Sequence, residues 1–247
     1  MRGPQGALTL ITFQIICGTF LLMVVNMFMW RFINRGYFRS TVWVLWPLQA
    51  ASAFLVPGRL RVLALAVAAS YLLFLLAIYS QRPLLEWSGA ALTTAASIWL
   101  VVELGMGACR PGCGWGVAQA LAGMFFLGSV THGMTLGHWY LNQARLPIEP
   151  LKVATWTVFG SLVVSLAAGV LGRSGLVSAI VPATVISVGG GTYWWTWLVL
   201  ALTTAGLMAM VRSTVWSRST QSATGLLYIA MVTAIGAQFV IDLLLLS

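Results

Sequence analysis

The stretch Ala7 to Trp30, ALTLITFQIICGTFLLMVVNMFMW, contains no charged residue and is long enough to cross a bilayer. A helix needs about 20 apolar residues to span a hydrocarbon core roughly 30 Å thick. The run is too long for the apolar region of a cleavable signal peptide, and no small-residue cleavage site follows it. We therefore expect this stretch to form the first transmembrane helix.

Similar apolar runs recur along the whole chain of 247 residues, which is 60% hydrophobic and only 7% charged. Soluble domains carry about 25% charged residues, so this composition excludes a soluble fold. We predict an all-α polytopic integral membrane helical bundle that forms a single transmembrane domain, residues 1–247. About eight transmembrane helices are expected, near 8–30, 41–56, 60–79, 84–106, 115–141, 151–171, 193–211 and 224–246. The run Leu176 to Val188 is shorter, contains Pro182 and ends in Gly189 to Gly191, so we interpret it as a re-entrant or interfacial segment.

Basic residues account for the formal net charge of +9, and they are scattered among the predicted loops. Scattered loop charges are typical of the positive-inside bias and of contact with anionic lipid headgroups, so nucleic acid is not an expected partner. With eight spans and the N-terminus outside, eight basic residues lie inside and five outside. If 176–188 also spanned, the distribution would become six against seven and the bias would vanish. We therefore expect a multi-pass protein of a bacterial inner membrane, with its N-terminus outside.

The predicted helix 115–141 carries both histidines of the chain, His132 and His138. Thr131, Thr135, His138 and Asn142 recur at the spacing of one helical face, whereas Gly133 and Gly137 form a GxxxG pair on another face. The two histidines are six residues apart, about 240° around a helix, so they cannot point at the same spot. The helix is thus expected to have one polar side and one side for close packing.

Two cofactors suit such a helix. A quinone headgroup needs a hydrogen-bond donor near the interface, a polar partner and an aromatic slot. His138 is predicted to bind the headgroup, with Trp139 and Tyr140 as walls and with Thr135 and Asn142 as orienting groups. A single haem is the alternative, with His132 as axial ligand and a methionine as its partner.

The remaining reactive side chains give weaker signals. Cys109 and Cys113 fall in a predicted outer loop and could be bridged by a disulfide in an oxidising compartment. Cys17 is interpreted as a buried apolar residue. Glu103 and Asp242 lie near the outer ends of their helices, where we expect them to pair with outer arginines.

Three functions follow as hypotheses. The first is an integral membrane subunit of a respiratory or photosynthetic electron-transfer assembly, with other membrane or peripheral subunits as partners; its helix number is similar to that of eight-helix quinone-reactive anchor subunits, an analogy of fold alone. The second is a small transporter or permease with a discontinuous helix near Pro182 to Gly191. The third is a non-catalytic structural or assembly protein. A retinal protein is excluded because the only lysine, Lys152, is not in the last helix.

Overall fold

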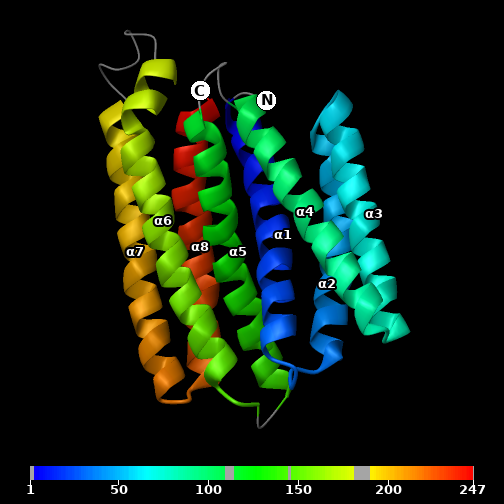
Figure 1. The fold of residues 1–247 in the computed structure, drawn as a ribbon. Helices are drawn as coiled ribbons and strands as arrows, with labels where there is room; N and C mark the ends of the chain where they lie inside the picture. Colours follow the sequence, from blue (N-terminus) through cyan, green and yellow to red (C-terminus); the bar gives the residue numbers. More distant parts are fainter. Residues whose placement is uncertain (1–2, 109–113, 144–145, 181–189, 247) are drawn as a thin grey trace.

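The computed structural model of the protein describes residues 3–108, 114–143, 146–180 and 190–246, and within these ranges every regular element is helical. The elements are α1 (Gly3–Met29), α2 (Arg35–Ser52), the short 3₁₀ helix η1 (Ala53–Leu55), α3 (Gly58–Ser80), α4 (Pro83–Ala108), α5 (Gly114–Asn142), α6 (Glu149–Ile180), α7 (Gly190–Trp216) and α8 (Thr220–Leu246). Successive helices run in alternating directions, and both ends of the described chain lie at the same end of the bundle (Figure 1). The predicted all-helical membrane bundle is confirmed.

Helix α5 lies at the centre of the bundle, between α1 on one side and α6 and α8 on the other (Figure 1). About 78% of its spanning segment is buried inside the protein, against 28% for α7 at the edge. A helix that is apolar all round and enclosed by other helices belongs to the core, whereas α7 presents most of its surface to lipid. The histidine-bearing helix is therefore the axis on which α1, α4, α6 and α8 pack.

Glycines allow α5 to approach its neighbours closely. Gly18 of α1 and Gly128 of α5 lie directly opposite each other, and a β-carbon on Gly18 would lie 2.9 Å from the Gly128 Cα. On another face of α5, a β-carbon on Gly137 would lie 2.8 Å from the Oγ1 of Thr224 in α8. The predicted close-packing face at Gly133 and Gly137 is thus confirmed, with α8 as the neighbour.

Seven described helices are long and apolar enough to cross a membrane, and α2 is the exception. Its 18 residues span about 27 Å at about 1.5 Å per residue, and they include Arg35, Arg39 and Pro47. The helix begins six residues before the expected Thr41, because the Asn34 side chain accepts a hydrogen bond from the Gly36 amide and caps the first turn. Its apolar C-terminal part is continued by η1.

Helix α6 is longer than expected. It continues to Ile180, nine residues beyond the predicted end at Leu171, and so includes the first residues of the proposed re-entrant segment 176–188. The remainder of that segment, 181–188, lies outside the described residues, as does the predicted disulfide pair Cys109 and Cys113.

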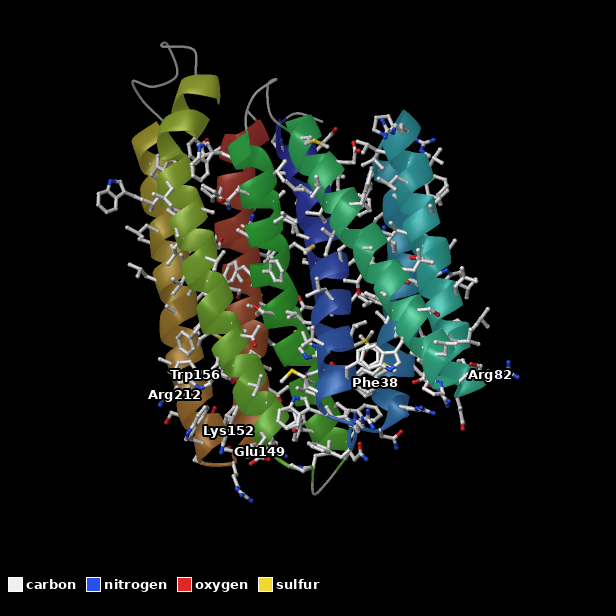
Figure 2. The ribbon with its side chains drawn as sticks, in the orientation of Figure 1. Phe38, Arg82, Glu149, Lys152, Trp156 and Arg212 are labelled. Atoms are coloured by element: carbon white, nitrogen blue, oxygen red, sulfur yellow. The ribbon has the colours of Figure 1, made fainter. Side chains whose placement is uncertain are left out.

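Basic side chains gather at the end of the bundle opposite the two termini. Figure 2 shows Arg82 there, in the connection between α3 and α4, together with Lys152 of α6 and Arg212 of α7. The guanidinium of Arg212 lies 5.3 Å from the ring centre of Trp156 and 5.1 Å from that of Trp216. Cations beside tryptophan rings are typical of the headgroup level of a bilayer.

Candidate functional site

An apolar groove of about 340 Å³ lies beside α5. Helices α1, α2, α5 and α8 supply its walls, which are Ile15, Thr19, Tyr37, Ser40, Thr41, Val44, Leu45, Leu48, Thr131, Met134, Thr135, His138, Trp139 and Tyr228. Eight of these 14 side chains are apolar or aromatic, and the other six are five threonine or serine hydroxyls and one imidazole. The groove falls within the roughly 300–1,000 Å³ that small-molecule sites occupy.

Three of the predicted site residues, Thr135, His138 and Trp139, line this groove together. His138 is exposed, and Trp139 packs against Tyr37 with 5.7 Å between ring centres. The indole Nε1 of Trp139 donates a hydrogen bond of 2.7 Å to the Gln143 side chain, which fixes the ring at the end of the groove. The groove thus presents one imidazole beside a positioned aromatic wall.

His132 points away from the groove and is almost completely buried. Its Nε2 lies 2.5 Å from the Nδ2 of Asn26 in α1, and its Nδ1 lies 3.2 Å from the hydroxyl of Tyr37 in α2. Together with Ser129 and residues of α1 and α6, Asn26 and His132 line a separate cavity of about 30 Å³. A cavity of that size holds one or two water molecules, because one water needs about 10–15 Å³.

A hydrogen-bonded chain therefore connects the groove to the small cavity. The Tyr37 hydroxyl lies 3.2 Å from the Oγ1 of Thr135, which in turn donates to the backbone carbonyl of His132. If the Asn26 amide donates to Nε2, the pattern assigns the imidazole proton to Nδ1, so that Nδ1 donates to Tyr37 and Tyr37 donates to Thr135. Both ring nitrogens of His132 and the hydroxyls of Tyr37 and Thr135 then have partners, as burial within a bilayer requires.

Two other predicted residues lie away from the groove. Tyr140 is buried, and its hydroxyl donates to the backbone carbonyl of Pro147, which ties the end of α5 to the connection before α6. Asn142 is exposed at the last residue of α5. Neither side chain belongs to the groove lining: Tyr140 faces the connection before α6, and Asn142 lies at the end of α5, one turn beyond His138.

The partners of His132 were missed at the level of sequence. Asn26 is the polar residue near the end of an otherwise apolar run, and a polar side chain inside a span usually marks an interhelical contact. The sequence gave less indication that Tyr37 is a partner, since Tyr37 follows the basic residues Arg31 and Arg35 in a segment interpreted as a loop. Only the packing of α2 against α1 and α5 brings Tyr37 to the histidine.

A second hollow of about 620 Å³ opens at the basic end of the bundle, between α1, α2 and α4. Its lining includes Arg31, Arg35 and Glu86, and a guanidinium nitrogen of Arg35 lies 3.0 Å from a carboxylate oxygen of Glu86. Gln143, which accepts from Trp139, also lines this hollow. Trp139 therefore stands between the apolar groove and a polar vestibule.

The arrangement defines a multi-span helical membrane protein with a lipid-side groove next to a buried polar chain. The sequence matches no protein-family model and no curated protein, and the fold matches no solved structure. The groove and its neighbouring side chains therefore carry the functional argument on their own.

Proposed function

We propose that the protein is an integral membrane subunit of an electron-transfer assembly and that it binds a quinone in the groove beside α5. A quinone has a flat ring, two carbonyl oxygens and an apolar tail. The groove offers a matching set of groups: an aromatic wall at Trp139, a hydrogen-bond donor at His138, and an apolar remainder formed with α2. The observation that carries the proposal is this combination of one imidazole and one indole in a groove of about 340 Å³.

The chain from Tyr37 through His132 to Asn26 supports the same function. Reduction of a quinone to a quinol takes up two electrons and two protons. The electrons would come from a redox-active partner subunit, and the protons would reach the headgroup through groups that hold and pass them. An imidazole between a tyrosine hydroxyl and a water-sized cavity is suited to that transfer.

The surroundings of His132 favour quinone over haem as the ligand. Both ring nitrogens already have partners, Asn26 and Tyr37, and the adjoining cavity of about 30 Å³ is far smaller than a porphyrin. Ligation of a haem iron through Nε2 of His132 would displace Asn26 from that nitrogen and require α1 and α6 to separate.

Photoaffinity labelling tests the proposal. The purified protein in lipid nanodiscs is illuminated with an azido-quinone, and labelled peptides are mapped by mass spectrometry. We expect label on α2 and α5 that unmodified quinone displaces. Ser40→Trp, which fills the groove from an exposed position of α2, should reduce this label at least tenfold.

Ser88→Trp is the matched control, because Ser88 is exposed on α4 and does not line the groove. This variant should label like the unmodified protein. Labelling that quinone does not displace, or that survives Ser40→Trp unchanged, would contradict the proposal.

A further inference from the structure

A second polar group is buried in the bundle, between α1, α5 and α8 and apart from the groove. It comprises Gln14, Gln119, Gln238 and Asp242, none of them more than 1% exposed. The Gln238 amide donates a hydrogen bond of 2.8 Å to Oδ1 of Asp242. Gln14 faces the same carboxyl group from α1 while its amide lies 3.3 Å from the carbonyl oxygen of Ala120.

Gly123 of α5 makes room for this group. A β-carbon at that position would overlap the amide groups of both Gln14 and Gln238. Gln119 precedes Gly123 by four residues and so lies on the same face of α5, one turn away. Three helices therefore bring one carboxylate and three carboxamides to one place inside the membrane domain.

Several acceptor atoms of the group are left without a donor. Among the described residues, Gln14 Oε1, Gln238 Oε1 and Asp242 Oδ2 are buried and have no hydrogen-bond partner. The Oε1 and Nε2 atoms of Gln119 are also buried without a partner. The described ion pairs of the carboxylates are Arg35 with Glu86 and Arg59 with Glu103, so Asp242 has no basic partner among them. Burial of an ionised carboxylate with so few donors is strongly unfavourable.

We propose that this group binds a monovalent alkali cation through the carboxylate of Asp242 and the carboxamide oxygens of Gln14 and Gln238, with Gln119 as a further ligand. The amide nitrogens of Gln238 and Gln14 are the atoms that make the present hydrogen bonds. Once the two carboxamides exchange the places of oxygen and nitrogen by rotation, a cation can pair with all of these oxygens at once, whereas a single proton on Asp242 can be donated to only one of them. Carboxylate and amide oxygens are the ligands that hard cations prefer. A single positive charge also leaves the site neutral, whereas a divalent ion would leave a buried net charge.

The group lies close to one end of the bundle. Asp242 lies one turn before Leu246, the end of α8, and Gln119 lies five residues after the start of α5 at Gly114. Both ends lie at the side of the bundle where the two termini lie (Figure 1). This proposal goes beyond quinone binding, because none of its residues lines the groove.

Thermal unfolding of the full chain in detergent tests the cation site. The buffer contains NaCl, KCl or choline chloride at equal ionic strength. A bound ion stabilises the folded state by mass action, so Tm should rise by several degrees in NaCl or KCl relative to choline chloride. If NaCl raises Tm, radioactive ²²Na⁺ should be retained at about one ion per chain. If KCl alone raises Tm, ⁸⁶Rb⁺ is used as the tracer instead.

Asp242→Asn should abolish both the Tm difference between salts and the retained ion. The salts are compared within the variant, so a change in the basal stability of the variant does not affect the result. Glu103→Gln, at the same end of the bundle but partly exposed and paired with Arg59, should keep both effects. Equal Tm values in the three salts with no retained ion would overturn the proposal. A Tm that depends on pH and not on the cation would overturn it in favour of a protonated carboxyl.

Discussion

His132 shows how a single polar side chain is accommodated inside an apolar bundle. Its two ring nitrogens reach α1 through Asn26 and α2 through Tyr37, so one residue of α5 connects three helices. Hydrogen bonds between membrane helices contribute about 0.6–2 kcal/mol each, and a partner left unpaired adds a further cost. His138, by contrast, is exposed on the same helix and is free to serve a ligand.

His132→Ala should therefore lower the free energy of unfolding by about 2–4 kcal/mol, because it removes two hydrogen bonds and leaves a cavity. His138→Ala should change it by less than about 0.5 kcal/mol, as is usual for exposed side chains. Denaturant titration in mixed micelles, followed by far-UV circular dichroism, measures both variants. Equal losses in the two variants would show that His132 does not bind the helices together.

The sequence indicated part of this site and missed the rest for a physical reason. Helical spacing on α5 was sufficient to group Thr131, Thr135 and His138 on one face, and these three residues do share the groove. Spacing says nothing about which other helix covers that face, so Tyr37, 95 residues away from His132, could not be assigned. Asp242 shows the same limit: we expected an interfacial ion pair, and the residue is instead buried beside Gln238. For Glu103, whose helix end is exposed, the expected pair with Arg59 is confirmed, at 3.7 Å.

At the level of the helices, the contact between α1 and α5 determines how closely the central helices can pack. Gly18 and Gly128 let the two backbones meet without side chains between them. Lipid tails are as apolar as leucine, so helix association in a membrane depends on such close packing rather than on removal of apolar surface from water. The Asn26–His132 contact lies about two turns further along α1 and one turn further along α5, and it requires the same close approach.

Gly18→Ala should lower the free energy of unfolding by about 1–3 kcal/mol, because the added methyl group would overlap the Met124 carbonyl and force α1 and α5 apart. Gly206→Ala on α7 is the matched control, since a β-carbon there would have no neighbour within 4 Å. The control should be neutral or slightly stabilising, because alanine favours a helix more than glycine does. Chemical unfolding of both variants in the same detergent is the measurement, and a control as unstable as Gly18→Ala would contradict the packing argument.

Helix bounds followed from apolar length where the chain is uniformly apolar. The predicted 60–79 became Gly58–Ser80, and the predicted 224–246 became Thr220–Leu246. The start of α2 was predicted six residues too late, because Arg35 and Arg39 suggested a loop. Arginines in a first turn at the membrane surface are compatible with a helix when a cap such as Asn34 satisfies its free amides. Sequence hydropathy cannot distinguish arginines in a loop from arginines in the capped first turn of a helix.

The arrangement of the whole bundle relates the two proposed sites to the two membrane surfaces. The buried Gln–Asp group belongs to the end that carries both termini, and the vestibule beside Trp139 belongs to the opposite, basic end (Figures 1 and 2). Under the proposed function, a redox partner would dock most directly at the basic end, where Gln143 both lines the polar vestibule and accepts the hydrogen bond of Trp139.

The charge distribution predicts which end faces the cytoplasm. The described basic residues near the connections 30–34, 81–82, 143–148 and 217–219 are Arg31, Arg35, Arg39, Arg82, Lys152, Arg212 and Arg218. Translocation of basic loops is disfavoured, so this end should be cytoplasmic and both termini should be outside. In a variant that lacks the three native cysteines, Pro57→Cys at one end and Ser217→Cys at the other report the orientation, because both positions are exposed.

A membrane-impermeant maleimide should label Pro57→Cys in intact cells, and it should label Ser217→Cys only after the membrane is permeabilised. The reverse pattern would place the basic end outside, and a docking partner for the groove would then have to be sought on that side. Labelling of both positions in intact cells would contradict the alternation of helix directions itself, since an odd number of crossings separates residue 57 from residue 217 in the fold described here.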